Sequence, residues 1–195
     1  MRPDRLVSAA AAPLGEVAGG ITNDLLAVPT PCAGYDVRAL IAHLLHWAPS
    51  LAGAGRKTPV PPPGADPAPP GHGWRTPRAE RTADLVAARG EPSAWEGTTR
   101  MVGPAEMPAP MIGGMVLTEL TVHAWDLARA IGGTVAWDPD AVAYTHDAVA
   151  RTAEMGRKMG AYGPEVPVPE TAPIIDRLLG LTGRNPTWTP AWQAS

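Results

Sequence analysis

Apolar side chains recur at helical spacing near the start of the chain. Between residues 4 and 19 they fall on one face of a predicted helix, at Leu6, Ala10, Leu14 and Val17. Thr22 is then a candidate N-cap for a short helical turn that extends to about Leu26. The proline- and glycine-containing stretch 29–34 interrupts the pattern.

A second amphipathic helix is predicted from residue 37 to about residue 51. Its apolar face is formed by Val37, Leu40, Ile41, Leu44, Leu45, Trp47 and Leu51. Asp36 directly precedes this run, where a carboxylate can accept hydrogen bonds from the free N–H groups of the first turn. We therefore expect Asp36 to cap this helix.

Residues 56–77 are rich in proline and poor in large apolar side chains. We expect a surface excursion or a lid over the bundle. A third helix is predicted over 78–89, with Gly90 as its end. Residues 91–110 show no clear period and are predicted as a loop with short extended pieces.

The segment 111–131 is apolar on nearly every side. Such a pattern is typical of a central helix that is buried all round, and Gly132-Gly133 supplies its stop. Polar side chains within it are therefore expected to have a specific reason to be there.

The last third of the chain continues with helical signals. Asp138 precedes a predicted helix that extends to about residue 159, and the tail 163–192 contains one short helical run, 174–181. The rest of the tail is expected to be an extended strap. The series of long helices predicts an all-α, up-down four-helix bundle that forms a single domain over residues 1–195.

Composition fits this fold and narrows the partners. Apolar residues make up 45% of the chain and charged residues 18%, as in globular proteins. The formal net charge is -3, and the 16 Lys and Arg residues are scattered, which argues against a nucleic-acid partner. Without an export signal or an apolar run of about 18 residues, we expect no contact with a membrane. The single cysteine, Cys32, permits no intramolecular disulfide, so a reducing cytoplasm is expected.

Three ionisable side chains of the predicted central helix share one face. Glu119, His123 and Asp126 are spaced at i, i+4 and i+7. The Glu119 carboxylate and the His123 imidazole can therefore bind the same ion. A buried carboxylate needs compensation, which a divalent cation provides. On spacing alone, a simple Glu119–His123 pair or a hydrogen-bonded core histidine is the stronger interpretation.

A third ligand candidate lies on the second helix. His43 belongs to the stripe that also contains Leu40 and Trp47, which is expected to face the bundle interior. His46 competes for this role, but its helical neighbours Ala42 and Ser50 form a weakly apolar face. Two histidines and one glutamate match the ligand set of catalytic zinc sites.

Other polar residues have simpler interpretations. For Asp126, an ion pair with Arg129 is favoured over a role in orienting a metal ligand. Cys32 is expected to be a packing residue, and His72 and His146 are expected on the surface. No phosphate-binding glycine loop, serine elbow or dinucleotide fingerprint occurs.

Three blocks of the chain resemble the DinB and mycothiol-dependent maleylpyruvate isomerase superfamily, specifically its actinobacterial metal-binding members. They are Thr30-Pro-Cys-Ala-Gly-Tyr-Asp-Val-Arg-Ala-Leu-Ile-Ala-His43, Glu119-Leu-Thr-Val-His123-Ala-Trp-Asp-Leu-Ala128 and Asp176-Arg-Leu-Leu-Gly-Leu-Thr-Gly-Arg-Asn-Pro186. The resemblance implies a four-helix bundle that binds zinc, or alternatively nickel or iron, through His43, Glu119 and His123. It also implies a low-molecular-weight thiol such as mycothiol as cosubstrate.

Two departures limit what the resemblance carries over. Tyr35 stands where the family commonly has Trp, and the isomerase itself has an additional C-terminal domain, whereas this chain stops at Ser195. We therefore do not expect maleylpyruvate isomerase activity as such.

Three functions stay open at this level. The first is a metal-dependent thiol transferase or thiol-dependent isomerase that acts on an electrophilic small molecule. The second is a metal-dependent hydrolase, lyase or rearrangement enzyme of specialised metabolism that uses no thiol. The third is a non-catalytic metal-binding protein, which predicts a fourth protein ligand, Asp126 or His46. Substrate specificity is expected from residues 91–110, the proline-rich loop and the tail, and a homodimer is one option for the oligomeric state.

Overall fold

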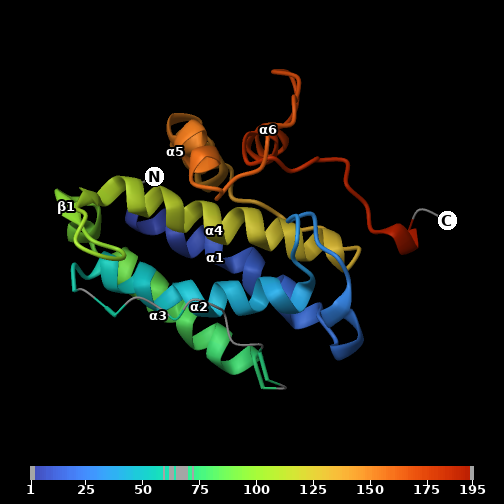
Figure 1. Cartoon of the computed structure of the whole chain (residues 1–195), viewed down its shortest axis with the longest axis horizontal. Helices are drawn as coiled ribbons and strands as arrows, with labels where there is room; N and C mark the ends of the chain where they lie inside the picture. The colour runs from blue at the N-terminus through green and yellow to red at the C-terminus, as the bar shows by residue number, and fades with distance from the viewer. Residues whose placement is uncertain (1–2, 59, 62–63, 65–69, 72, 194–195) are drawn as a thin grey trace.

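The structure is a computed structural model, and it confirms the predicted all-α fold (Figure 1). It describes residues 3–58, 60–61, 64, 70–71 and 73–193. The helices are α1 (Pro3–Gly20), α2 (Val37–Gly55), α3 (Arg75–Gly90), α4 (Ala109–Ala130), α5 (Pro139–Lys158) and α6 (Ile174–Leu181). Short 3₁₀ turns are η1 (Asn23–Ala27), η2 (Pro92–Trp95) and η3 (Ala191–Gln193), and a two-residue antiparallel pair joins β1 (Thr98–Thr99) to β2 (Met107–Pro108).

Helix ends follow the predicted caps closely. The Asp36 carboxylate accepts a hydrogen bond from the Ala39 N–H at 2.7 Å, and Asp138 begins α5 in the same way. At the end of α4, Gly132 adopts a positive φ of 74°, which lets the next N–H, that of Gly133, bond back to the Ala128 carbonyl at 2.8 Å. Thr22 precedes a turn as predicted, but its side chain makes no capping bond.

Some boundaries differ from the prediction. α2 continues past residue 51 because the small residues 52–55 pack closely against neighbouring helices. α3 begins at Arg75 rather than at residue 78, and α4 begins at Ala109 with proline in its first turn, a position where proline costs no hydrogen bond.

Helices α2 and α3 run in the same direction, so the predicted up-down order is wrong for this pair. Arg81, near the middle of α3, donates to the Leu45 carbonyl, whereas the end of α2 meets the later part of α3 through an ion pair between Arg56 and Asp84. The chain between α2 and α3 must therefore return along the bundle. This requirement explains why the connection is long and cannot be a tight turn.

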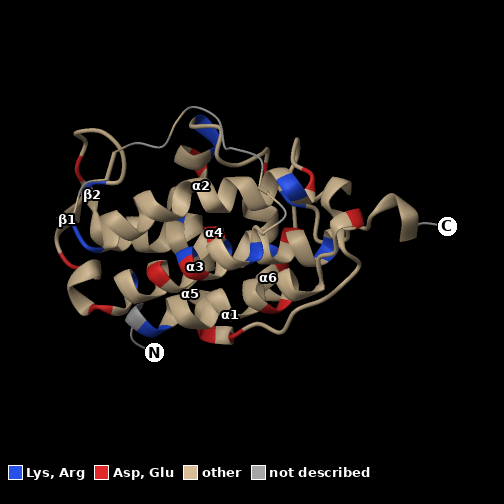
Figure 2. Cartoon of the chain, turned by 90° about the horizontal axis from the view of Figure 1, so that it is seen from below, with Lys and Arg blue, Asp and Glu red and all other residues tan. Residues whose placement is uncertain are grey.

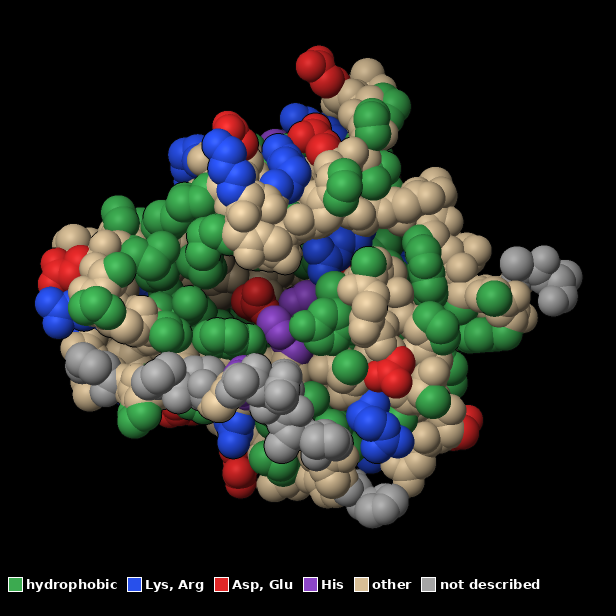
Figure 3. All heavy atoms as spheres, in the orientation of Figure 1, with side chains coloured by type: hydrophobic (Ala, Val, Ile, Leu, Met, Phe, Trp, Pro, Cys, Tyr) green, Lys and Arg blue, Asp and Glu red, His purple; other side chains and the backbone are tan. Residues whose placement is uncertain are grey.

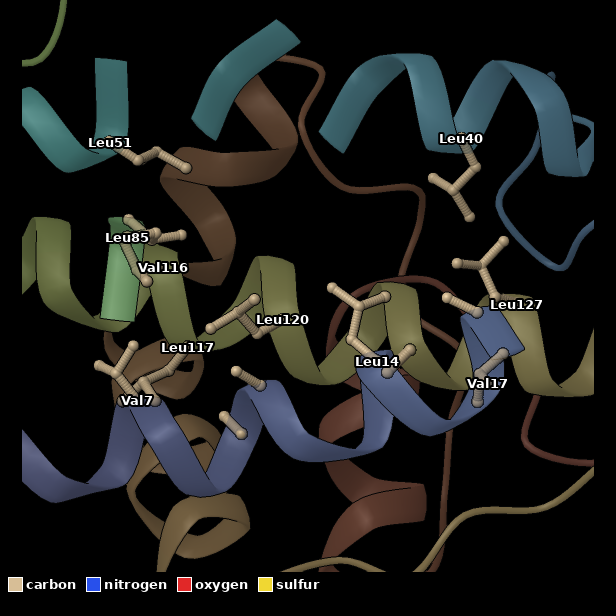
Figure 4. Packing of buried hydrophobic residues seen from close by; sticks show 14 of the residues in the cluster. Val7, Leu14, Val17, Leu40, Leu51, Leu85, Val116, Leu117, Leu120 and Leu127 are labelled. Atoms are coloured by element: carbon tan, nitrogen blue, oxygen red, sulfur yellow. The ribbon is translucent and has the colours of Figure 1, made fainter. Parts of the chain in front are cut away.

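Helix α4 is the centre of the molecule. Apolar side chains of α1, α2, α3 and α4 meet in one core, among them Val7, Leu14, Leu40, Leu51, Leu85, Val116, Leu117 and Leu120 (Figure 4). Burial of each such leucine stabilises the fold by roughly 1.5–3 kcal/mol relative to an exposed side chain. α4 also packs on its other side, where Val122 and Trp125 contact Val149 of α5 and Leu178 of α6.

Charged residues of both signs are spread over the helices. In Figure 2, segments with Lys or Arg lie among segments with Asp or Glu. Among the described residues, no helix combines the length and the apolar character that crossing a bilayer requires.

Gly113 of α4 provides a test of this packing. A Cβ at this position would overlap the ring of Trp95, whose indole N–H is fixed by a bond to the Arg89 carbonyl at 2.9 Å. We expect Gly113→Ala to lower the free energy of unfolding by about 1–3 kcal/mol, measured by urea denaturation. Gly15→Ala in α1, where nothing lies within 4 Å of the added carbon, is the control and is expected to stabilise by up to about 1 kcal/mol. Equal effects of the two changes would contradict the packing described here.

Candidate metal centre

Two helices bring together the side chains that were predicted as ligands. His43 extends from the first half of α2, and Glu119 and His123 lie one turn apart on α4. The Glu119 Oε2 atom lies 3.0 Å from His43 Nε2 and 3.3 Å from His123 Nε2. One donor atom from each residue falls within 4.8 Å of the other two.

These distances fit a shared divalent ion. Nitrogen and oxygen ligands held tetrahedrally at about 2.0–2.2 Å lie roughly 3.3–3.6 Å from one another, close to the separations between the carboxylate oxygen and the two imidazoles. The donor set of two imidazoles and one carboxylate is also one that zinc prefers. The residues present therefore suit the metal that the sequence predicts.

Asp126 orients one of these ligands. Its carboxylate is completely buried, and Oδ2 lies 2.9 Å from His123 Nδ1. This contact favours a proton on Nδ1, so Nε2, which faces Glu119, is the nitrogen that would bind a metal ion once the imidazole is neutral. The predicted ion pair between Asp126 and Arg129 is wrong, because the Arg129 guanidinium instead donates to the Trp188 carbonyl at 2.6 Å.

The cation that neutralises Asp126 comes from the tail. Arg184 Nη2 lies 3.1 Å from Asp126 Oδ2, and Nε lies 3.4 Å from Oδ1. The same Nη2 donates to the Cys32 sulfur at 3.1 Å. Cys32, His123 and Asp126 form a second group of ligand-type atoms, but Arg184 already supplies the positive charge there.

The charges of the ligands depend on one another. Burial alone raises the pKa of the Glu119 carboxyl, but His123 and His43 hold that pKa well below its usual range. Burial alone lowers the pKa of His123, but Glu119 and Asp126 raise it to about 9. In the metal-free protein at neutral pH, the Glu119 carboxylate is thus negatively charged. The His123 imidazole is protonated on both ring nitrogens and carries a positive charge.

All three candidate ligands line a cavity of about 340 Å³. Figure 3 shows acidic and histidine side chains together in a hollow, with basic side chains at its edge. The remaining wall comes from the turn before α2, the first turns of α2 and the segments after α5 and α6: Pro31, Cys32, Ala33, Tyr35, Leu40, Gly160, Ala161, Tyr162, Gly163, Thr182, Gly183 and Arg184.

Sequence reasoning missed part of this wall. Tyr162 and Arg184 were not singled out, although Arg184 falls within the third block of family resemblance. Cys32 was expected only to pack, whereas its thiol lies in the cavity wall beside Arg184. Of the segments predicted to set specificity, the tail does line the cavity, but residues 91–110 and the described part of the proline-rich loop do not.

The remaining histidines lie away from the centre. His46 packs against Trp47 with ring centroids 5.3 Å apart and does not line the cavity. His146 is half-buried on α5 and pairs with Asp147 at 3.3 Å. His72 lies outside the described residues.

Comparison with known proteins shows a family match and two similar curated sequences. Residues 7–128 match the family model described as the mycothiol maleylpyruvate isomerase N-terminal domain. Two uncharacterised proteins of Mycobacterium tuberculosis, from strains CDC 1551 and H37Rv, are each 31% identical over 169 residues, which cover 85% of this chain and 88% of the relative.

Solved structures show the same fold. A crystal structure of the mycothiol-dependent maleylpyruvate isomerase matches with a TM-score of 0.58 at 20% identity, and a histidine-to-alanine mutant of that enzyme matches with 0.59 at 18%. Both matches cover 77% of this chain and 68% of the other chain. The match to the family model contains all three candidate ligands and Asp126 but ends before Tyr162 and Arg184.

The Asp126 contact can be tested by its effect on metal affinity. We expect Asp126→Asn to weaken zinc binding by about 10- to 100-fold, because His123 loses the carboxylate that orients it. Titration against a competing chelator measures the change. Asp147→Asn, which alters the other His–Asp contact, on α5, should leave the affinity unchanged. An unaltered affinity in Asp126→Asn would contradict the orienting role.

The proton on His123 predicts a pH dependence. Metal binding requires the neutral imidazole, so between about pH 7 and pH 9 the ion must displace this proton. The logarithm of the apparent association constant should rise by about one per pH unit over this range and level off above it. Calorimetry in buffers of different ionisation enthalpy should show the release of the proton at pH 7.5. A flat profile would mean that His123 is neutral in the metal-free protein.

Proposed function

Because the chain belongs to the family of mycothiol maleylpyruvate isomerase N-terminal domains, we propose that it is a divalent-metal-dependent enzyme that uses a low-molecular-weight thiol such as mycothiol. Its reaction is thiol transfer to, or thiol-dependent isomerisation of, an electrophilic small molecule. The observation that carries this proposal is that the two imidazoles and the carboxylate converge on the wall of one cavity.

His43, Glu119 and His123 would hold the ion. When bound, a divalent metal such as zinc, nickel or iron lowers the pKa of a coordinated thiol and makes it a nucleophile at neutral pH. Asp126 keeps His123 in the tautomer that this role requires, and Arg184 pairs with Asp126. The protein thus contributes a fixed arrangement of ligands.

The charge of the site favours an anionic ligand. The carboxylates of Glu119 and Asp126, the guanidinium of Arg184 and a divalent ion together leave one net positive charge. A single thiolate neutralises it, and an uncompensated charge in a largely buried site is unfavourable. This balance supports a thiolate over a neutral ligand.

The nucleophile is expected to come from outside the chain. Burial raises the pKa of the Cys32 thiol to about 11, so this side chain stays protonated at neutral pH despite the nearby Arg184. Cys32 is the single cysteine of the sequence. A small thiol that enters the cavity therefore supplies the reactive sulfur.

A closed, purely structural metal site is less well supported. That function predicts Asp126 or His46 as a fourth ligand. Within the described residues, neither is grouped with His43, Glu119 and His123, and the Asp126 carboxylate is already shared between His123 and Arg184.

Titration of the cobalt-substituted protein with mycothiol tests the thiol. We expect a sulfur-to-metal charge-transfer band that grows with thiol concentration and saturates. An unchanged spectrum would contradict the thiol function and favour either a reaction without thiol or a non-catalytic ion. Mycothiol whose sulfur is methylated is the control, because it cannot form a thiolate.

Metal content tests the ligand assignment. We expect His43→Ala, Glu119→Ala and His123→Ala each to lose stoichiometric zinc, measured by elemental analysis of purified protein, whereas His146→Ala retains it. Full metal content in all three ligand variants would show that the ion binds elsewhere. Circular dichroism of each variant establishes that it is folded.

A further inference from the structure

Helix α4 is exposed along one line that leads away from the metal centre. Between Ala109 and Ala130 every residue is buried except Met111, Met115, Glu119 and Arg129 along the helix and Pro110 in its first turn. The first three follow one another at four-residue spacing, so they lie on one face over about 12 Å of the helix. Glu119 at the end of this line is a candidate metal ligand, and the two methionines precede it.

A second cavity lies beside these methionines. Its volume is about 140 Å³, and Tyr144 and Ala148 of α5 form the wall that faces Met111 and Met115. Tyr162 lines this cavity and the larger one that contains the ligands, so its ring stands at the boundary between them. Thr118, also in the wall, directly precedes Glu119.

The boundary is built by close packing. Gly156 of α5 has no side chain, and a Cβ there would overlap the Tyr162 ring. Gly114 similarly allows α4 to approach Ala148, where an added carbon would lie 2.8 Å from the alanine Cβ. These two contacts hold α5 and Tyr162 against α4 and fix the position of the smaller cavity next to the larger one.

The lining of the smaller cavity suits an apolar ligand. The hydroxyls of Thr118 and Thr152 are already bonded to carbonyls of their own helices, at 2.9 and 3.0 Å. The thioethers of Met111 and Met115 are flexible and polarisable, and they adapt to apolar groups of varied shape. Arg151, the charged residue in this wall, is exposed to solvent. Figure 3 shows hydrophobic side chains extending to one side of the hollow that holds the acidic and histidine groups.

We propose that this line along α4, from Glu119 to Met111, binds an extended apolar part of the electrophilic substrate. The inference rests on the proposed function, in which the reactive carbon meets the thiol at the end of the line occupied by Glu119. It names the substrate class as an electrophile with an apolar chain or ring. We call the surface along α4 from Glu119 to Met111 the groove. A short, highly charged acid would leave the end of the groove at Met111 and Met115 empty.

Binding of alkanethiols to the cobalt-substituted protein tests the groove. The sulfur anchors each probe, and the charge-transfer band reports its dissociation constant for ethanethiol, butanethiol and hexanethiol. If the alkyl chain of the probe lies along α4, the affinity for the thiol should increase up to about fourfold for each added methylene. Hexanol, which lacks the sulfur, should produce no band.

A pair of matched variants locates the binding site of the alkyl chain. Met115→Gln keeps the length of the side chain but makes it polar, so hexanethiol should bind at least fivefold more weakly while ethanethiol is unaffected. Met159→Gln makes the same change at a residue that is 74% exposed and should alter neither probe. Met111→Gln serves the same purpose if thermal unfolding shows that Met115→Gln is not folded.

The outcomes separate the two proposals. Absence of a band with every thiol would overturn the proposed function and, with it, this inference. A band with ethanethiol, combined with no gain from longer chains or no loss in the folded methionine variants, would overturn the groove alone.

Discussion

The buried carboxylate of Asp126 is the group on which the centre depends. A fully buried charge without partners costs several kcal/mol, so the chain around it must supply compensation. His123 on the same helix and Arg184 from the tail do so, and the second of these also reaches Cys32 in the turn before α2. One carboxylate thereby fixes the imidazole of a candidate metal ligand and connects three distant parts of the chain.

Local signals in the sequence predicted most of what lies on the helices. The apolar stripe containing Leu40 placed His43 inside the bundle, and four-residue spacing placed Glu119 beside His123, because both patterns depend only on helix geometry. The caps at Asp36 and Asp138 were predictable for the same reason.

Long-range partners were not predictable in this way. Asp126 has Arg129 three residues away, and spacing alone favours that pair, yet the tail brings Arg184 to it across 58 residues of sequence. The parallel direction of α2 and α3 could not be predicted either, because a proline-rich connection indicates a loop but not the direction of the helix that follows it. Tyr162 and Cys32 lie in turns between helices. No hydrophobic period there indicates which way a side chain faces.

The cavity wall extends past the segment that matches the family model. The candidate ligands and Asp126 lie within that segment, whereas Tyr162 and Arg184, which complete the cavity wall, follow it in the sequence. The packing of Tyr162 on Gly156 illustrates how a single small residue in α5 shapes that wall without touching the ligands.

Arg184 follows Asp126 by 58 residues, and this separation has a consequence for synthesis on the ribosome. Chains emerge from the N-terminus and begin to fold in that order. Helices α1 to α4 are therefore made before the guanidinium that neutralises Asp126 exists. Until the segment that contains Arg184 has been made and docks, the nascent bundle holds a carboxylate that lacks its cation. Formation of the candidate centre thus waits for synthesis of the segment that follows α6.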